Sequence, residues 1–254
     1  MIKIVLITGA TSGFGKATAT LFAQNGHDLI ITGRRWNLLE ELATELKKVN
    51  MIDVMPLCFD IRVKDDVENA IFSLPEKWKK IDVLINNAGL ASGLGPIQEG
   101  DYEDWEKMID TNVKGLLYMT RTVAPMMIVN RKGHIVNVGS IAGKETYPNG
   151  NVYCATKYAV DSLTKGMRID LLPHGIKVTQ ISPGAAETEF SLVRFHGDKQ
   201  RAENVYKGFQ PLKPEDVASV IYYVTTLPDH VNINDLVIMP TAQASSMHFN
   251  RTEG

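Results

Sequence analysis

The sequence lacks several features that would assign it to a specialised class of protein. No apolar run is long enough to span a bilayer, so we expect no membrane insertion. Its two cysteines, Cys58 and Cys154, lie in apolar or helical stretches and predict free thiols in a reducing compartment. A net charge of −2 argues against nucleic acid or an anionic membrane surface as a partner. The six histidines and two cysteines show no zinc-ligand spacing, so no metal site is predicted.

The composition that remains is that of an ordinary globular domain. The 254 residues are 44% hydrophobic and 22% charged, which is enough apolar material for a large core without disulfides or metals. No repeat, low-complexity tract or linker divides them, and we predict one domain over residues 1–254. The first strand-like run begins almost at Met1 and leaves no room for a signal peptide, so we expect a cytoplasmic protein.

Apolar runs alternate with helical patterns along the whole chain. The runs predict strands at residues 3–7, 28–35, 54–59, 82–85, 132–138, 175–181 and 235–239. Between them, helical spacing predicts helices that include residues 37–49, 105–129 with an interruption at Pro125, 153–172 and 215–226. This alternation predicts an α/β fold, a doubly wound parallel sheet of about seven strands with helices on both faces.

A glycine-rich turn follows the first predicted strand. Residues 8–15 read TGATSGFG and run directly into a helical pattern. Glycines let the backbone approach a phosphate closely, and a helix N-terminus offers free N–H groups. The GxxxGxG spacing differs from the GxGxxG fingerprint, and a tight strand-to-helix connection would also explain it.

Two arginines stand at the end of the second predicted strand. In a dinucleotide site an acidic residue there holds the ribose 2′-hydroxyl of NAD, whereas arginine accommodates the 2′-phosphate of NADP. Gly33 occupies the place of the acid, and Arg34 and Arg35 follow it. The alternative is a solvated basic pair before a helix. Because the acid is missing and the bases are present, we predict NADP(H) as the cofactor.

A serine, a tyrosine and a lysine suggest acid–base chemistry. Tyr153 and Lys157 are four residues apart and share a helix face, while Ser140 follows a predicted buried strand. A nearby ammonium lowers the pKa of a phenol, and a serine hydroxyl can donate to the oxygen whose charge changes. A surface Tyr/Lys pair would look the same in isolation.

Taken together and in order, these motifs resemble the short-chain dehydrogenase/reductase family over almost the whole chain. The resemblance rests on residues 8–15, Asn86-Asn87-Ala88-Gly89, Asn112, Ser140, Tyr153 with Lys157, and Pro183-Gly184. Stretches such as TGRR at 32–35, YEDW at 102–105 and TEFS at 188–191 resemble the NADP-dependent 3-hydroxy acid dehydrogenases within it. That group oxidises L-serine, L-allo-threonine and 3-hydroxyisobutyrate, reduces malonic semialdehyde, and forms cytoplasmic homotetramers.

The resemblance implies a cofactor half at about residues 1–140 and a catalytic and substrate half at about 141–254. Tyr153 would be the general acid/base, Lys157 would lower its pKa and bind the nicotinamide ribose, Ser140 would orient the substrate oxygen, and Asn112 would anchor a water that relays protons to Lys157. The implied cofactor residues are Gly9, Thr11, Ser12, Gly13, Phe14, Gly15, Arg34, Arg35, Asp60, Ile61, Asn87, Ala88, Gly89, Tyr153, Lys157, Pro183, Gly184, Ala186 and Thr188. Asp60 has a second explanation, as the cap of the next helix.

The segment after Pro183-Gly184 bears on the substrate. Ser140 and Tyr153 would contact the substrate oxygen, and Arg194 could hold a substrate carboxylate through its guanidinium fork; a surface arginine on a covering helix is the alternative. Glu187 departs from the glycine-containing run expected here, and beside the nicotinamide it would alter loop closure or disfavour an acidic substrate.

The predicted function is reversible, NADP-dependent oxidation of a 3-hydroxy acid to its 3-oxo acid. One alternative is a carbonyl reductase of the same family for a non-acidic ketone, diketone, sugar or steroid. Another is a catalytically silent NADPH sensor, which the intact Ser140, Tyr153 and Lys157 oppose. A lyase or epimerase of the extended family would need a larger C-terminal substrate domain.

Overall fold

A seven-stranded, all-parallel sheet forms the centre of the molecule in the computed structural model, which describes residues 2–252. The strands are β1 (Ile4–Ile7), β2 (Asp28–Gly33), β3 (Val54–Cys58), β4 (Val83–Asn86), β5 (Gly133–Val138), β6 (Ile176–Pro183) and β7 (Asp235–Ile238), in the order β3-β2-β1-β4-β5-β6-β7. The order reverses direction between β1 and β4, which is where open α/β sheets bind their ligands. The predicted fold class is confirmed.

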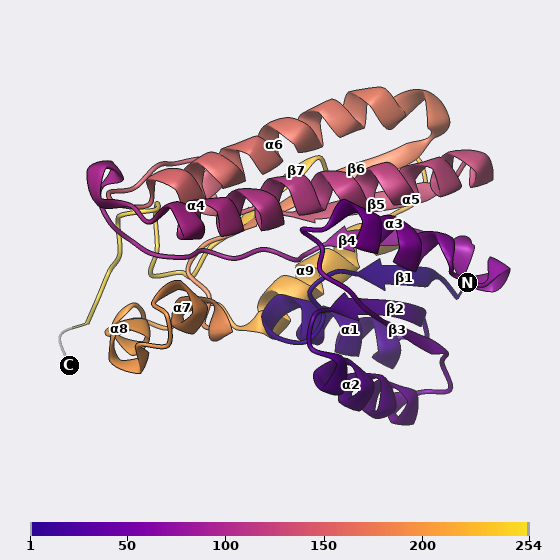
Figure 1. Cartoon of the computed structure of the whole chain (residues 1–254), viewed down its shortest axis with the longest axis horizontal. Coiled ribbons are helices and arrows are strands. Elements are labelled where there is room, and N and C mark those ends of the chain that lie inside the picture. Colours follow the sequence, from indigo (N-terminus) through magenta and orange to yellow (C-terminus); the bar gives the residue numbers. More distant parts are fainter. Residues whose placement is uncertain (1, 253–254) are drawn as a thin grey trace.

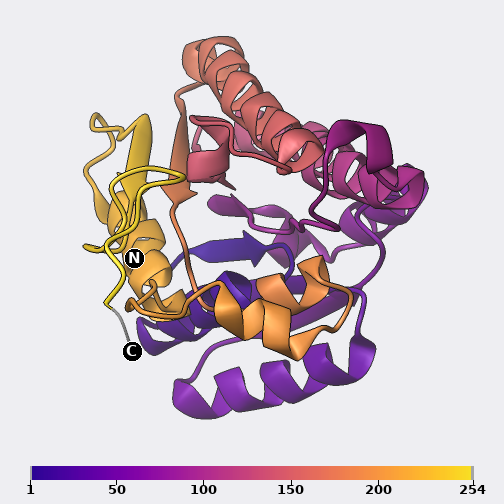
Figure 2. The ribbon, with the colours of Figure 1, turned by 90° about the vertical axis from the view of Figure 1, so that its left-hand side faces the viewer.

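Helices cover both faces of the sheet, as Figures 1 and 2 show. One layer contains α1 (Gly13–Gln24), α2 (Trp36–Val49) and α9 (Pro214–Thr226); the other contains α3 (Lys64–Phe72), α4 (Tyr102–Ile109), α5 (Leu116–Asn130) and α6 (Asn151–Leu171). Each helix turns an apolar stripe inward: Leu39, Leu42 and Leu46 of α2 are buried, while the charged residues between them face solvent. The central strands are buried on both faces, which explains their unbroken apolar sequences.

The helix predicted over residues 105–129 is wrong in its start and in its interruption at Pro125. The helix expected over residues 105–129 is three segments: α4, a π-helical turn at Asp110–Gly115, and α5, which continues through Pro125 to Asn130. The helix begins earlier than predicted because Asp101 caps it, accepting bonds from the backbone N–H groups of Glu103 and Asp104. A π-turn inserts an extra residue into the helical ladder, and it falls on Asn112.

Two short helices lie at one end of the sheet, beside the C-terminal segment (Figure 1). They are α7 (Glu189–Arg194) and α8 (Lys199–Asn204), in the stretch between β6 and α9. The side chain of Thr188 caps α7 by accepting from the backbone N–H of Phe190. The chain's last described residues run past α8, where the backbone N–H of Thr252 donates to Gly208 O at 2.8 Å. This end of the sheet holds the candidate site.

Candidate active site

The glycine-rich turn between β1 and α1 is packed too tightly for side chains. Gly9 and Gly13 have φ values of 64° and 50°, which L-residues rarely adopt. A Cβ on Gly15 would lie 2.2 Å from the carbonyl oxygen of Gly9. Asn87, after β4, ties the turn down by donating from Nδ2 to the Thr8 and Gly9 carbonyl oxygens at 2.8 and 3.1 Å. The resulting loop presents backbone, not side chains, in front of the N-terminus of α1, as phosphate binding requires.

The arginine pair lies at the edge of the same cavity. Arg35 donates from Nη2 to Thr11 Oγ1 at 2.9 Å, and its Nη1 lies 3.4 Å from Glu189 Oε2 of α7. Arg34 Nη1 is 3.8 Å from Asp60 Oδ2, and about half of each arginine side chain is exposed. Asp60 does not cap a helix by itself; it is occupied by Arg62, which donates from Nη2 at 2.6 Å. Both arginines line the cavity and are about half exposed, so an anion in the cavity can reach them.

Ser140, Tyr153 and Lys157 come together where β5 ends and α6 begins. Tyr153 and Lys157 are both buried, and Lys157 Nζ donates to the carbonyl oxygen of Val138 at 3.0 Å. Burial lowers the pKa of Lys157 to about 8. Burial also raises the pKa of Tyr153, and Tyr147 acts in the same direction, while the Ser140 hydroxyl and Arg194 oppose it. The lowering that Lys157 was predicted to exert on Tyr153 is not seen here, because burial dominates both groups.

Asn112 uses its whole side-chain amide within the protein. Its Oδ1 accepts from the backbone N–H of Leu90 at 2.8 Å, and its Nδ2 donates to Leu90 O at 2.8 Å and to Thr156 Oγ1 at 3.0 Å. A Cβ on Gly89 would lie 3.2 Å from Asn112 Oδ1 and 3.4 Å from Lys157 Nζ, so Asn112 lies close to the lysine without contacting it. The amide fixes the segment after β4, and the water-anchoring role stays a prediction.

Arg194 lies over the aromatic rings at the substrate end of the site. Its guanidinium carbon is 5.6 Å from the Tyr153 ring centre and 5.4 Å from that of Tyr147, and Nη1 donates to Tyr147 Oη at 2.9 Å. Nε donates to Gly93 O at 3.3 Å. Nη2 is buried and has no hydrogen-bond partner among the described residues, which is expensive for a charged donor. Arg194 therefore lines the cavity, and its binding of a substrate carboxylate stays a prediction.

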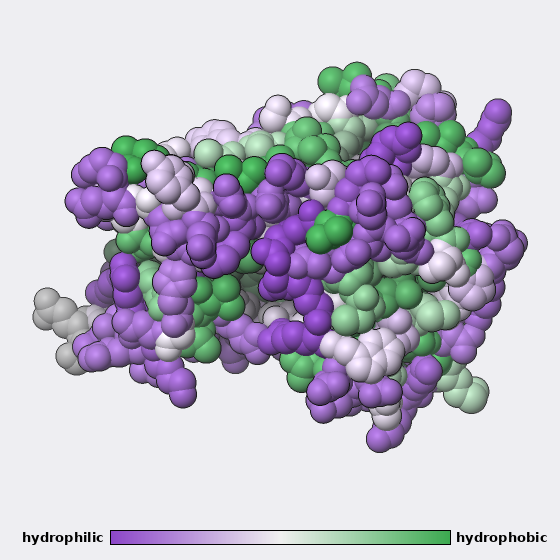
Figure 3. Space-filling model, viewed as in Figure 1, coloured by the Kyte–Doolittle hydropathy of each residue, from purple (hydrophilic) through white to green (hydrophobic). Residues whose placement is uncertain are grey.

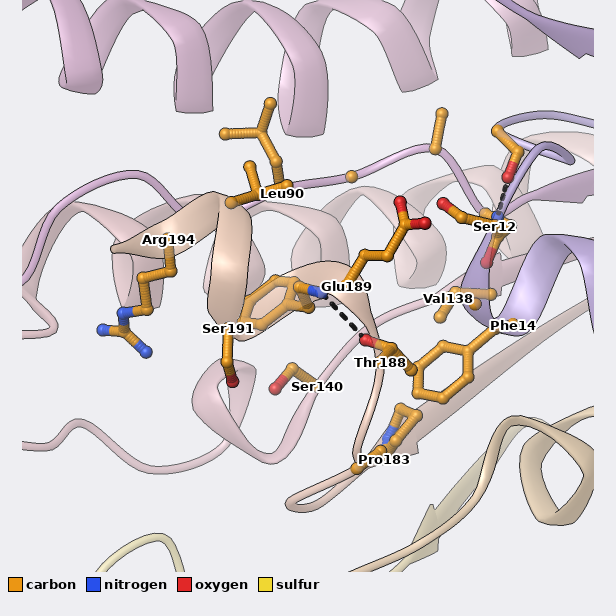
Figure 4. A pocket seen from close by; sticks show the side chains of 18 of the residues that line it. Ser12, Phe14, Leu90, Val138, Ser140, Pro183, Thr188, Glu189, Ser191 and Arg194 are labelled. Carbon is orange, nitrogen blue, oxygen red and sulfur yellow. Dashed lines mark hydrogen bonds between the residues drawn. The ribbon is translucent and has the colours of Figure 1, made fainter. Parts of the chain in front are cut away.

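One cavity of about 580 Å³ joins these groups. In Figure 3 a hollow opens below α4, with apolar residues inside and polar residues along its rim. In Figure 4, Ser12 and Phe14 lie at one end of this cavity and Arg194 and Ser191 at the other. Of all the predicted site residues, only Gly15 and Asn112 do not line it; both pack immediately behind the lining.

The structure also corrects and extends the predicted substrate end. The sequence suggested a Glu187 carboxylate beside the nicotinamide. In the structure Glu187 is exposed and does not line the cavity. Its backbone N–H donates to Leu212 O at 2.9 Å. Sequence reasoning missed Tyr147 and Phe249, which line the cavity from a loop and from the C-terminal segment. Neither lies in a motif or at a helical spacing that points to the site.

Comparison with known proteins agrees with this geometry. The model of the family described as short chain dehydrogenase matches residues 3–198. The chain belongs to the short-chain dehydrogenase family.

No helix among residues 2–252 is both long and apolar enough to cross a membrane. Within the same residues no group of three or more His, Cys, Asp or Glu side chains is placed to hold a metal ion.

Three relatives of this short-chain dehydrogenase are informative. The NADP-dependent 3-hydroxy acid dehydrogenase YdfG of Escherichia coli (strain K12) is 48% identical over 242 residues, covering 95% of this chain and 96% of the relative. Sulfoacetaldehyde reductase 2 of Chromohalobacter salexigens is 48% identical over 247 residues, 97% of each chain. A structure described as the closed form of serine dehydrogenase complexed with NADP+ has a TM-score of 0.91 and 47% identity, covering 99% of this chain and all of the other.

Proposed function

We propose that this short-chain dehydrogenase interconverts 3-hydroxy acids and 3-oxo acids with NADP(H) as cofactor. The 3-hydroxy acid dehydrogenase and the serine dehydrogenase among its relatives support this assignment. The observation that carries it is Arg194, a half-buried cation over the ring of Tyr153 whose Nη2 has no hydrogen-bond partner among the described residues. A guanidinium in this position provides the counter-charge for an acid group two bonds from the reacting carbon.

The cofactor part of the cavity fits NADP. The crowding at Gly9 and Gly15 and the positive φ of Gly13 favour bare backbone against a pyrophosphate. Arg34 and Arg35 stand where a 2′-phosphate would need cations, and no acidic residue follows β2 to prefer NAD. Bound NADP supplies the hydride acceptor, and NADPH the hydride donor. Ala88, Gly89, Pro183, Gly184, Ala186 and Thr188 line the remaining wall.

Tyr153 is the proton-transfer residue in this proposal. Because burial raises its pKa, the neutral phenol is the abundant form near pH 7, ready to donate a proton to a carbonyl oxygen during reduction. In oxidation the phenolate must take the hydroxyl proton, so we expect the oxidation rate to increase with pH. Ser140, which also lines the cavity, donates to the same substrate oxygen, and the Lys157 cation stabilises the phenolate that forms.

Arg194 and Tyr147 together make a two-point anion contact. Tyr147 accepts from Arg194 Nη1, so its own hydroxyl proton is free for a second acceptor. Burial raises the pKa of Tyr147, which keeps that proton in place at neutral pH. The Arg194 guanidinium and the Tyr147 O–H, which both belong to residues that line the cavity, thus provide two donors for one carboxylate.

Initial rates at 340 nm test the assignment. We would measure these rates with NADP and with NAD as cofactor, and with L-serine, L-allo-threonine, 3-hydroxyisobutyrate and the neutral amide of 3-hydroxyisobutyrate as substrates. Arg194→Ala should raise KM for the acids by about 100-fold, the worth of a charged hydrogen bond, and leave the amide nearly unchanged. The matched control is Arg121→Ala, an exposed arginine that does not line the cavity. Equal losses on acid and amide would remove Arg194 from acid recognition, and activity on the amide alone would favour a reductase for neutral carbonyls.

A second candidate is reduction of a sulfonated aldehyde. It is favoured by the relative named as a sulfoacetaldehyde reductase, which is as similar in sequence as the hydroxy acid dehydrogenase. A guanidinium binds a sulfonate as well as a carboxylate, although the two donors described above suit a planar group better than a tetrahedral one. NADPH oxidation with sulfoacetaldehyde and with malonic semialdehyde separates the two. A higher kcat/KM for sulfoacetaldehyde would reverse the assignment.

We also propose a cytoplasmic homotetramer. Exposed apolar side chains on the outer helices and on β7 support self-association, among them Tyr158, Ile169 and Val237. The two cysteines are free, as expected in a reducing compartment. Light scattering after size-exclusion chromatography measures the assembly; a mass of one chain would contradict it.

A further inference from the structure

Arg194, at the end of α7, is bonded to a segment that is distant from it in the sequence. The two segments are the loop after β4, and α7 with the turn that ends it. The backbone N–H of Gly93 donates to Arg194 O at 2.9 Å, and Arg194 Nε donates to Gly93 O at 3.3 Å. The position of the guanidinium over Tyr153 therefore depends on how these two segments meet.

A buried carboxylate on α4 joins the same two segments. Asp104 is 7% exposed. Its Oδ1 accepts from Ser92 Oγ at 2.6 Å, and its Oδ2 lies 3.1 Å from His196 Nε2. Ser92 precedes Gly93, and His196 is two residues after Arg194. A carboxylate buried to this extent is expensive unless it is paired, so it favours the arrangement in which both partners are present.

Two residues next to Asp104 have left-handed backbone conformations. Gly93 has a φ of 71°, and a Cβ on it would be 2.8 Å from Asp104 Oδ2. His196 itself has a φ of 52°, a left-handed conformation in which glycine is usual after a helix. Histidine adopts this conformation more often than most L-residues, and here its ring, which is 60% exposed, contacts Asp104. Lys107 is the other charged group facing the carboxylate, at a looser 3.8 Å from Oδ1.

We propose that Asp104 and His196 are positioning residues that hold Arg194 in place for the acid group of the substrate. Neither residue lines the main cavity, so neither contacts the reacting atoms. They act through the Gly93–Arg194 contacts, by clamping the loop through Ser92 and the end of α7 through His196. This inference rests on the proposed function, in which Arg194 binds the acid.

Asp104→Asn and His196→Asn test the clamp with little change in size. Asparagine tolerates a left-handed backbone, so His196→Asn removes the imidazole contact without forcing the turn to change. Because the clamp acts on the substrate only through Arg194, its loss should cost about one ordinary hydrogen bond and raise KM for 3-hydroxyisobutyrate by about five- to tenfold, with kcat and NADP affinity within about twofold of wild type. KM for the neutral amide should not change. KM of the double variant should be no higher than that of the more impaired single variant, because both substitutions break the same Asp104–His196 contact.

Matched controls separate positioning from general stability. Lys107→Gln removes the looser partner of Asp104, and His230→Asn changes an exposed histidine elsewhere; both should leave KM for the acid within about twofold. If the clamp variants weaken acid and amide equally, or move only the melting temperature, the pair serves the fold and the proposal is overturned.

Amide hydrogen exchange provides a readout that needs no substrate. In the wild type the N–H of Gly93 is bonded to Arg194 O and should exchange slowly; both variants should accelerate it. Unchanged exchange would overturn the clamp whatever the kinetics show. Faster exchange together with an Arg194→Ala variant that does not discriminate acid from amide would refute acid binding by Arg194 while supporting its positioning by Asp104 and His196.

Discussion

Replacing Lys157 with methionine should stabilise the protein at neutral pH while it abolishes catalysis. Lys157 is buried, and its one hydrogen bond goes to the carbonyl oxygen of Val138. Burial alone accounts for its lowered pKa, with no contribution from a carboxylate among the described residues. Burying the charged lysine thus lowers the free energy of unfolding, as is common for groups that take part in catalysis.

The size of the effect follows from the pKa. A decrease from 10.5 to about 8 means that folding penalises the protonated lysine by about 3 kcal/mol. Methionine of similar length removes that penalty and also removes the bond to Val138 O, which contributes about 1 kcal/mol. We therefore expect Lys157→Met to raise the free energy of unfolding by about 2 kcal/mol at pH 7.

The pH dependence has a defined sign. Below pH 8 both states carry the proton, and the wild type bears the whole penalty. Between pH 8 and 10.5 the native state loses the proton while the unfolded state keeps it, so the wild type becomes more stable relative to the variant as pH rises. The advantage of Lys157→Met should therefore be greatest below pH 8 and should disappear by about pH 10.5.

Urea denaturation at pH 6.5, 8, 9 and 10 measures this difference directly. Lys165→Met on the same helix is the control, because Lys165 is 61% exposed and its pair with Asp161 should be worth less than about 1 kcal/mol. A variant that is less stable than wild type at pH 6.5 would refute the reasoning. A stability gain that is constant across the pH range would show that improved packing, not removal of a buried charge, is the cause.

Two further predictions concern the cofactor end. Arg35→Gln should weaken NADP binding by about tenfold and leave NAD binding unchanged, because only NADP has a phosphate for the guanidinium; titration calorimetry with both cofactors checks this, and equal losses would contradict it. Gly15→Ala should abolish NADP binding, because its Cβ would lie 2.2 Å from Gly9 O and displace the turn. Gly166→Ala, in open space on α6, should instead raise stability by about 0.5–1 kcal/mol with normal binding.

The sequence by itself determined the elements whose signals are local. Unbroken apolar runs predict strands buried on both faces, and β1, β2 and β4 lie where these runs are. The glycine turn, the arginine pair and the Tyr/Lys spacing are likewise short-range patterns. The parallel sheet then brings them to one edge, since all its strands end on the same side. For this reason nearly every predicted site residue lines one cavity.

Only the tertiary structure decided how the substrate end is assembled. The π-turn at Asn112 depends on the packing of Leu90 and Thr156 against its amide. Arg194 meets Tyr147 across 47 residues, and His196 meets Asp104 across 92. No periodicity or spacing encodes contacts of this kind, because they depend on where loops close after the sheet has formed. The pKa values of Tyr153 and Lys157 belong here too: the residue types suggest mutual stabilisation, whereas burial, a property of the folded state, governs both.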